Sequence, residues 1–306
     1  MERRVVAMGE IKIERQAKLP TWFGIGGGAD RLARPASVDD VRRCVELDPK
    51  LRILGDGANL LVDDAGVGEL VIAFTRPEMM SVHRDDATGL TVAMAGANLP
   101  KLIVEAVRLG LGGIEGLGGI PATVGGAVIM NAGGAFGQIS DAVVRVHGID
   151  RRGHARTLER SEIAFGYRHS GLNDLVITSV ELDLRPGDPM ALRDRLKEVM
   201  AYKKSTQPMA EKSAGCVFRN PTLTRPLDGI ADAGARVSAG MLLDRAGCKG
   251  LKIGAAEISD WHANFFVTRP GATAHDVISL MELGAKKVLD RFGVTLEREV
   301  VVWRRG

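Results

Sequence analysis

The sequence has few cysteines and lacks the long apolar segments of membrane proteins. Its 306 residues include three cysteines, Cys44, Cys216 and Cys248, and no pair of them has CxxC spacing. A disulfide framework or a zinc site is therefore not expected. No run of about 18 consecutive apolar residues occurs, and the N-terminus has no apolar signal-peptide core. We expect a cytoplasmic protein that does not span a membrane.

Several nucleotide-binding and hydrolase signatures are also absent. There is no GxxxxGK[ST] sequence for a P-loop and no GxSxG nucleophile elbow. The six histidines are scattered without HxxxH spacing, which gives a metal site little support. The net charge is only +3, and basic residues are mostly interspersed with acidic ones, so nucleic-acid binding is not expected.

The most unusual segment spans residues 112–137 and reads GGIEGLGGIPATVGGAVIMNAGGAFG. Glycine fills ten of its 26 positions, and Glu115 is its only charged residue. Repeated glycine indicates positive φ angles or close backbone approach, and the interleaved apolar residues indicate burial. A buried glycine-rich backbone with free N–H groups is typical of sites for phosphates and flat cofactors. We interpret this segment as the wall of a cofactor site.

Two shorter glycine clusters require different interpretations. Residues 24–29, GIGGGA, match the letters of a dinucleotide fingerprint, but Pro35 follows too soon for the helix that such a fingerprint needs. Residues 55–59, GDGAN, lie between two predicted strands. Their N–H groups are compatible with phosphate binding, and a plain tight turn is equally compatible with this cluster.

The order of the predicted elements favours an α+β fold, because helices and strands mix without regular βαβ alternation. Capping-box patterns at Ser37/Asp40 and Thr273/Asp276, and Asp188 before Pro189, predict helix starts. The expected helices cover residues 38–47, 99–109, 189–203, 238–247 and 274–292. The expected strands include residues 69–75, 90–96, 141–149, 174–186 and 295–303.

Three polar clusters are candidate sites for chemistry: residues 165–170 (FGYRHS), residues 212–221 (KSAGCVFRNP) and the C-terminal strand with Glu297 and Glu299. Each also has an ordinary structural interpretation. A Tyr-Arg pair is commonly at the surface, a glycine-flanked cysteine is commonly a small buried residue, and a glutamate on a terminal strand commonly faces water. The residues alone leave this choice open.

Several blocks, in order and over nearly the whole chain, resemble the UDP-N-acetylenolpyruvoylglucosamine reductase family. They are TWFGIGGGADRLARP, LGDGANLLV, GLGGIPATVGGAVIMNAGGAFG, FGYRHS, KSAGCVFRNP, AGCKGLKIGAAEISDWHANFFV and LEREV. The chain resembles the short form of the family, which lacks an extra substrate-covering insertion.

The resemblance implies an α+β fold of the vanillyl-alcohol-oxidase-like (PCMH) type. Two FAD-binding domains are expected over residues 1–74 and 75–204, and an α+β substrate-binding cap domain over residues 205–293. The C-terminal strand, residues 294–306, is expected to return to the FAD-binding part.

The resemblance also implies a flavoenzyme with bound FAD and NADPH as co-substrate. It would reduce UDP-N-acetylglucosamine enolpyruvate to UDP-N-acetylmuramate in peptidoglycan precursor synthesis, by a ping-pong scheme. A monomer acting on small molecules, without nucleic acid or membrane partners, is expected. The alternatives are an FAD-dependent oxidase of the same fold acting on another substrate, and a non-catalytic protein that binds flavin or nucleotide sugar.

Site residues follow from the matching motif positions. Arg168, Cys216 and Glu299 match the catalytic residues, and no metal is implied. The expected substrate-binding residues are Tyr167, Lys204, Gln207, Asn220 and Asn264. The expected FAD-binding residues are Gly55, Asp56, Gly57, Ala58, Asn59, Leu60, Gly118, Gly119, Ile120, Pro121, Thr123, Gly125, Gly126, Asn131 and Ala132.

The chain departs from the family pattern at three positions. Cys216 stands where serine is usual, Ala58 replaces a serine of the flavin turn, and Thr268 replaces an asparagine. A thiol can donate a proton as a hydroxyl does, unless a nearby cation converts it to thiolate. We therefore predict that Cys216 is the general acid, and the rival interpretation is altered or lost activity.

Overall fold

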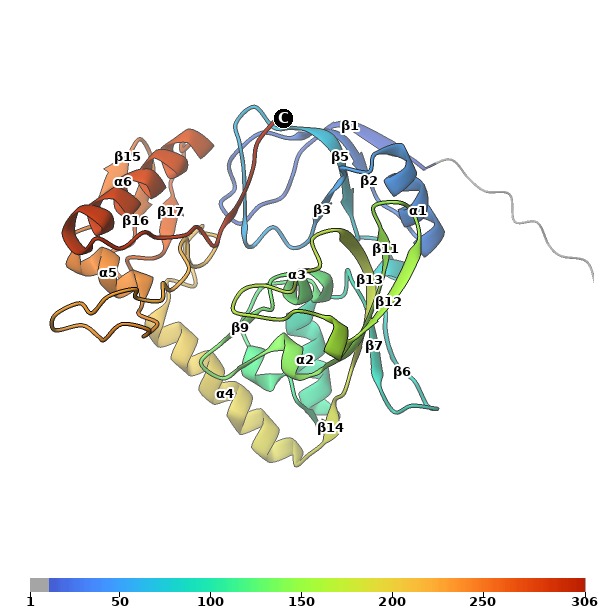
Figure 1. The fold of residues 1–306 in the computed structure, drawn as a ribbon. Coiled ribbons are helices and arrows are strands. Elements are labelled where there is room, and N and C mark those ends of the chain that lie inside the picture. The colour runs from blue at the N-terminus through green and yellow to red at the C-terminus, as the bar shows by residue number, and fades with distance from the viewer. Residues whose placement is uncertain (1–10, 306) are drawn as a thin grey trace, which may run out of the picture.

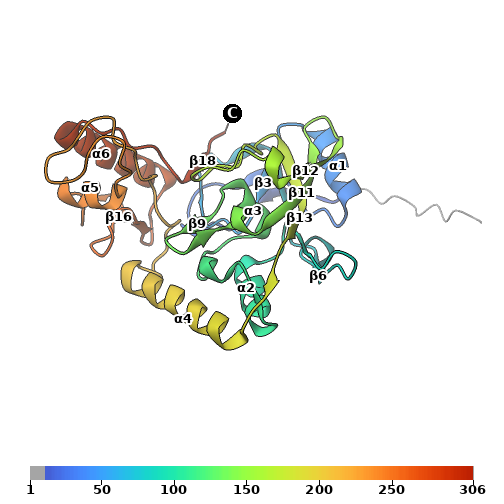
Figure 2. The ribbon, with the colours of Figure 1, turned by 60° about the horizontal axis from the view of Figure 1, so that its bottom comes forward.

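The computed structural model describes residues 11–305. Residues 1–10 and 306, at the outer ends of the expected ranges 1–74 and 294–306, lie outside the described residues. Figure 1 shows three parts, coloured blue to light blue, cyan to yellow-green, and orange to red along the chain. Helix α4 (Pro189–Thr206), in yellow, runs from the second part to the third in both ribbon views (Figures 1 and 2).

The first part contains a four-stranded sheet in the order β1-β2-β5-β3. Its elements are β1 (Ile13–Ala17), β2 (Ala29–Ala33), α1 (Val38–Leu47), β3 (Arg52–Leu54) and β5 (Val67–Ala73). The cluster at residues 24–29 leads into strand β2 and not into a helix, so it is not a dinucleotide fingerprint, as the early Pro35 indicated. Ser37 caps α1 by accepting from the Asp40 N–H, as its capping-box pattern predicts, and Cys44 is a buried residue of that helix.

The first part contains a second strand pairing, which joins it to residues near position 300. Strand β18 (Val301–Trp303) pairs in parallel with β4 (Leu60–Val62), which directly follows the GDGAN turn. The Val301 N–H donates to the Asn59 carbonyl at 3.1 Å, and the Asp63 N–H donates to the Trp303 carbonyl at 2.8 Å. The segment that carries Glu299 is therefore fixed beside this turn.

The second part is built on a five-stranded antiparallel sheet in the order β12-β11-β13-β7-β6. Helices α2 (Leu99–Arg108) and α3 (Val124–Ile129) contribute to one hydrophobic core with this sheet. The strands are β6 (Val82–Arg84), β7 (Thr91–Met94), β11 (Val143–Asp150), β12 (Ala155–Glu159) and β13 (Leu175–Leu182). Its shorter elements are the 3-10 turns Pro77–Met79, Glu115–Leu117, Ile139–Asp141 and Arg160–Glu162, with β8 (Leu111–Gly112), β9 (Gly133–Gly134), β10 (Gly137–Gln138) and β14 (Arg185–Pro186).

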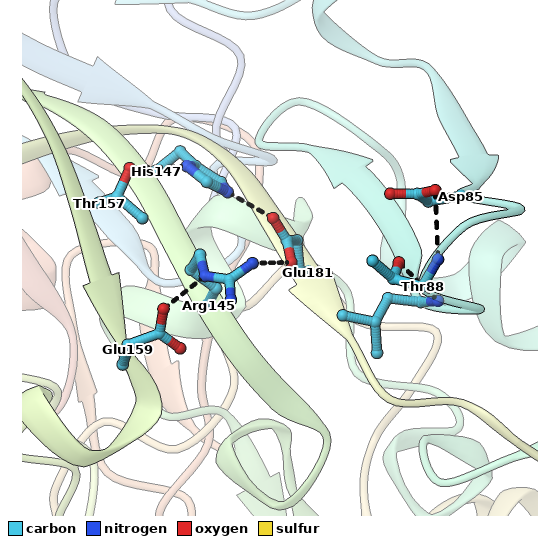
Figure 3. A network of polar contacts seen from close by, with 8 residues as sticks. Asp85, Thr88, Arg145, His147, Thr157, Glu159 and Glu181 are labelled. Atoms are coloured by element: carbon cyan, nitrogen blue, oxygen red, sulfur yellow. Dashed lines mark hydrogen bonds and ion pairs between the residues drawn. The ribbon is translucent and has the colours of Figure 1, made fainter.

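An ion-pair network lies on one face of this sheet (Figure 3). Arg145 donates to Glu159 and to Glu181, each at 2.6 Å, and His147 Nε2 lies 2.7 Å from Glu181. These residues belong to three neighbouring strands, so their contacts connect β12, β11 and β13 across the sheet. None of the four lines the large cavity described below.

The third part combines a three-stranded sheet with two helices. The strands are β15 (Lys252–Ile253), β16 (Ala256–Ile258) and β17 (Phe266–Thr268), and the helices are α5 (Ala239–Arg245) and α6 (Ala274–Phe292). Thr273 and Asp276 form the predicted capping box of α6, and Gly293 ends it at φ 64° in the left-handed region. Among residues 11–305, no helix combines the length and apolar character needed to cross a bilayer.

The predicted strand over residues 295–303 is correct only at its end, because residues 295–300 do not form a regular strand. Residues 297–299 instead pair irregularly with the segment after Cys216. The Arg219 N–H donates to the Glu297 carbonyl at 2.9 Å, and the Glu299 N–H donates to the Val217 carbonyl at 2.7 Å. Strand β12, which follows the arginine-rich turn, was not among the predicted strands.

The β18–β4 pairing predicts different effects for two tryptophan substitutions. Trp303 is 9% exposed, and the Arg52 guanidinium lies 5.6 Å from its ring centre. Trp303→Ala should lower the free energy of unfolding by about 3 kcal/mol, because a large buried side chain is lost. Trp261, 59% exposed, is the matched control, and Trp261→Ala should change this free energy by less than about 0.5 kcal/mol. Urea unfolding measures both, and equal effects would contradict the assigned role of Trp303.

Candidate active site

One large cavity lies where the three parts meet. Its volume is about 1660 Å³, and residues from all three parts line it. Sites for a single small ligand usually enclose about 300–1,000 Å³. This cavity is therefore large enough for a bulky cofactor together with a second molecule.

The turn between β3 and β4 forms one wall of the cavity. All six residues predicted there for cofactor binding, Gly55 to Leu60, line the cavity. Gly57 has φ 69°, and a Cβ atom on it would lie 2.3 Å from the Pro20 carbonyl oxygen. Glycine is required here by both the backbone angle and the close approach.

The tip of this turn suits an anionic group. In the part of the chain that the structure describes, the N–H groups of Asp56, Gly57 and Ala58 have no protein acceptor. Successive free N–H groups in a turn form a concave anion site. The Asp56 carboxylate would oppose an anion, but the Trp22 indole donates to it at 3.2 Å, and burial raises the pKa of Asp56 above its ordinary value.

The glycine-rich segment forms a second wall. Thr123 caps the short helix α3 by accepting from the Gly126 N–H at 3.2 Å, so the segment contains a helical turn within its irregular backbone. The predicted residues that line the cavity are Gly119, Ile120, Pro121, Thr123, Gly125, Gly126 and Ala132. Their side chains are small or apolar apart from the Thr123 hydroxyl, so this wall can bind and orient a ligand but supplies little acid or base chemistry.

Two residues predicted for this wall do not reach the cavity. Gly118 is buried against α4, where a Cβ atom would lie 2.5 Å from Leu196 Cδ1. Asn131 is 1% exposed, and its side-chain amide donates to Gln138 and to the Gly166 carbonyl. Gly118 permits close packing and Asn131 fixes the loop before Tyr167, so their contact with a ligand stays a prediction.

Arg168, Cys216 and Glu299 come together on the cavity wall, although they are far apart in the sequence. Arg168, with φ 55°, donates from Nε to Glu299 Oε1 at 2.7 Å. The backbone pairing of Glu299 with Val217 sets Cys216 beside this ion pair. On its other side, Cys216 forms a β-bridge with Phe265.

Burial favours the protonated form of both acids in this group. It raises the pKa of Cys216 to about 12, helped by the negative charge of Glu299 and opposed by Arg168 and by a hydrogen bond from the Asn264 side chain. Burial also raises the pKa of Glu299, and the charge and hydrogen bond of Arg168 oppose that rise. The Cys216 thiol therefore keeps its proton at neutral pH despite the adjacent guanidinium.

Tyr167, Gln207 and Asn220, three of the predicted substrate-binding residues, line the cavity. The Tyr167 hydroxyl accepts from the Asn220 N–H at 3.3 Å, which fixes the ring. The Arg236 guanidinium lies 4.1 Å from the centre of this ring, a cation–π contact. This part of the wall is cationic and aromatic, as a site for an anionic nucleotide requires.

The position of Lys204 favours its neighbour for the predicted substrate contact. That side chain is exposed and does not line the cavity, whereas its neighbour Lys203 does. Consecutive residues of a helix point about 100° apart, so spacing from Cys216 alone could not distinguish them. Burial, with Arg168 nearby, lowers the pKa of Lys203 to about 8.

Asn264 is also not a residue of the cavity wall. It is 1% exposed, and its side chain pairs with the backbone of Phe218. Thr268, the residue without an interpretation, donates to the Phe23 carbonyl at 2.7 Å and so connects the third part to the first.

The sequence analysis did not predict several residues that line the cavity. They are Trp22, Phe136, Tyr202, Lys203, Arg219 and Arg236. Trp22 and Phe136 lie inside the blocks that carry the family resemblance, so these blocks could have indicated them. Tyr202 and Lys203 follow only from the rotation of α4, and no local signal identifies them.

Comparison with known proteins identifies two family models in the chain. Residues 29–159 match "FAD binding domain", and residues 207–303 match "UDP-N-acetylenolpyruvoylglucosamine reductase, C-terminal domain". The free N–H groups of the GDGAN turn and the small or apolar side chains of the glycine-rich wall fit the phosphates and the flat ring of FAD.

Relatives match over nearly the full length. The UDP-N-acetylenolpyruvoylglucosamine reductase of Moorella thermoacetica is 39% identical over 94% of this chain and 91% of the relative. That of Heliobacterium modesticaldum is 40% identical over 94% of this chain and 89% of the relative. The crystal structure of UDP-N-acetylenolpyruvylglucosamine reductase from Thermus caldophilus has a TM-score of 0.80 and 38% identity, covering 96% of this chain and 100% of that one.

The close approach at Gly57 predicts that FAD binding depends on this glycine. Gly57→Ala should weaken FAD binding by at least about tenfold, because the new methyl group would displace the turn from the Pro20 carbonyl. Gly229 has φ 66° and no atom within 4 Å of an added Cβ, so Gly229→Ala controls for backbone strain alone. Titration followed by flavin fluorescence gives both dissociation constants, and equal FAD affinities would refute the prediction.

Proposed function

Because this chain belongs to the UDP-N-acetylenolpyruvoylglucosamine reductase family, we propose that Arg168, Cys216 and Glu299 carry its reaction. The enzyme is a UDP-N-acetylmuramate dehydrogenase of peptidoglycan precursor synthesis, with FAD as cofactor and NADPH as reductant. Its substrate class is a UDP-linked enolpyruvyl ether. The observation that carries the assignment of roles is the meeting of a guanidinium, a protonated thiol and a buried carboxyl on one cavity wall.

The residues that would hold FAD are the turn Gly55–Leu60 and the lining residues of the glycine-rich segment. When bound, FAD supplies hydride transfer from NADPH to carbon 3 of the enolpyruvyl group. The turn's N–H groups bind the phosphates, and the glycine wall orients the ring. The protein must then bind the substrate carboxylate, stabilise the charge that develops on it and deliver a proton to carbon 2.

Arg168 is the cation for the substrate carboxylate. Its Nε is committed to Glu299, which leaves the two terminal nitrogens available for a planar carboxylate. Charge develops on that carboxylate as hydride adds, so a fixed guanidinium stabilises the transition state more than the ground state. Glu299 orients Arg168 through Oε1, and when its Oε2 carries a proton that oxygen can donate to the same carboxylate; burial shifts the pKa of Glu299 in the direction of this form.

Cys216 is the general acid. Its S–H bond breaks as a C–H bond forms at carbon 2, and the electron pair stays on sulfur. The substrate thus gains one hydride at carbon 3 and one proton at carbon 2, and solvent later returns a proton to the thiolate. The raised pKa of Cys216 supports this role, because a thiolate could not donate.

The nucleotide half of the substrate is assigned to Tyr167, Gln207, Asn220 and Lys203, which replaces the predicted Lys204. Lys203 provides a positive charge for a diphosphate. Domain boundaries at residues 1–74, 75–204, 205–293 and 294–306 are part of the same proposal. The monomeric state and cytoplasmic location stay predictions.

Two flavin half-reactions test the function and the role of Cys216. NADPH should bleach the yellow holoenzyme, and the UDP-enolpyruvyl substrate should restore its colour. Cys216→Ala should keep bleaching by NADPH but slow recolouring by about 10²–10⁴-fold, because the proton donor is lost. Stopped-flow absorbance measures both steps.

The matched control is Cys248→Ala, since Cys248 is buried in the third part and does not line the cavity. That variant should keep both half-reactions. Full-rate recolouring in Cys216→Ala would remove the general-acid role. A wild-type protein that binds no FAD would overturn the function as a whole, and oxygen-driven recolouring without substrate would favour an oxidase.

The lowered pKa of Lys203 predicts that kcat/KM depends on pH. Its pKa of about 8 means that the free enzyme loses this charge as the pH rises through 8. The kcat/KM for the UDP-enolpyruvyl substrate should therefore fall about tenfold between pH 7 and pH 9. Lys203→Arg should abolish this fall, and Lys203→Met should give a low value that does not show it.

Lys204→Met is the control, because that side chain is exposed and outside the cavity. It should keep the wild-type pH profile of kcat/KM. A profile that changes in Lys204→Met and not in Lys203→Met would assign the diphosphate contact to Lys204 after all.

A further inference from the structure

The Asn264 side chain pairs with the backbone of Phe218, two residues after Cys216, as a neighbouring strand would. Its side-chain Oδ1 accepts from the Phe218 N–H at 2.9 Å, and its Nδ2 donates to the Phe218 carbonyl at 2.8 Å. Its own carbonyl accepts from the Val217 N–H at 2.8 Å. These three bonds hold the two residues that follow Cys216, so they fix the direction in which the Cys216 backbone enters the cavity wall.

The Asn264 amide has one N–H left after this pairing. An amide nitrogen carries two hydrogens, and one of them is used by the Phe218 carbonyl. Interaction with the Asn264 side chain also opposes the rise of the pKa of the Cys216 thiol, against the larger effect of burial. A donor to sulfur stabilises the thiolate more than the thiol, so Asn264 favours the form that Cys216 takes after giving up its proton.

The turn that carries Asn264 is itself held in place. The Asn264 N–H donates to His262 Nδ1 at 3.1 Å, and the His262 ring packs edge-on against Phe265 at 5.0 Å between centres. Asn264 is 1% exposed and does not line the cavity, so it cannot contact a substrate there. Any effect on the reaction must pass through Cys216 or its backbone.

We propose that Asn264 is a positioning residue for Cys216, which aims the sulfur into the cavity and donates an N–H to the thiolate formed by proton transfer. This inference rests on the proposed function. In the step itself, the S–H bond breaks, the new C–H bond takes the proton, and the sulfur keeps the electron pair. The Asn264 hydrogen stays on nitrogen and only strengthens its bond to sulfur.

A double-mutant cycle in the holoenzyme separates this role from a merely structural one. Asn264→Asp keeps the shape and an acceptor for the Phe218 N–H but has at most one donor, so the sulfur loses its N–H. We expect bleaching by NADPH to stay within twofold and recolouring by the UDP-enolpyruvyl substrate to slow at least about tenfold. In a Cys216→Ala background, Asn264→Asp should cause no further slowing.

Alkylation of Cys216 provides a readout independent of turnover. Iodoacetamide at pH 9, followed by peptide mass spectrometry, measures how readily the thiolate forms. Asn264→Asp should slow this labelling by about threefold for each unit by which the thiol pKa rises, because the smaller thiolate fraction outweighs its greater nucleophilicity. Asn264→Ser, smaller and uncharged, should change both readouts in the same direction and replaces the aspartate variant if that one does not fold.

Thr268→Val is the matched control. Thr268 is 4% exposed on β17, and its hydroxyl donates to the Phe23 carbonyl and not to sulfur. The Thr268→Val variant should lose a buried hydrogen bond yet keep the wild-type rates of recolouring and labelling. Equal slowing by Asn264→Asp in both backgrounds, or no slowing in either, overturns the inference. If Cys216→Ala itself recolours at full rate, the general-acid role of Cys216 in the proposed function fails instead, and the labelling rate still reports whether Asn264 donates to sulfur.

Discussion

The site depends on one backbone arrangement, in which residues 216–219 lie between residues 264–265 and residues 297–299. The pairing is short and irregular. Val217 and Arg219 form backbone hydrogen bonds with residues 297–299 on one side, and Val217 bonds to the Asn264 carbonyl on the other. It places the thiol of Cys216 and the carboxyl of Glu299 on one wall of the cavity. Arg168, from the second part, meets this wall through its bond to Glu299, so residues from distant parts of the sequence share one geometry.

Burial acts on the titratable groups of this wall in a consistent direction. It raises the pKa values of Cys216 and Glu299 and lowers that of Lys203, so each is displaced toward its neutral form. A guanidinium keeps its proton in such surroundings, and Arg168 therefore supplies the fixed positive charge. A thiol can thus act as an acid beside a cation, because desolvation by burial has a larger effect on its pKa than the attraction of the adjacent charge.

Local sequence located two walls of the cavity, because a glycine-rich turn and a glycine-rich apolar segment are short-range features, but the capped helical turn α3 inside the second wall was not predicted. The GDGAN turn and most of the glycine-rich segment lie where their residues indicated. The differences came from features that need tertiary information. Lys203 and Lys204 differ only in the rotation of α4, Gly118 and Asn131 serve packing and loop contacts, and residues 295–300 pair with a segment about 80 residues earlier.

The β18–β4 pairing has a consequence for how the enzyme matures during translation. The GDGAN turn is made about 240 residues before the strand that supports it and the carboxyl that orients Arg168. Loop closure over 240 residues, between Asn59 and Glu299, must therefore precede a finished flavin pocket. A nascent or truncated chain that lacks residues 297–303 has an open wall, so its flavin pocket is not finished until these residues are in place.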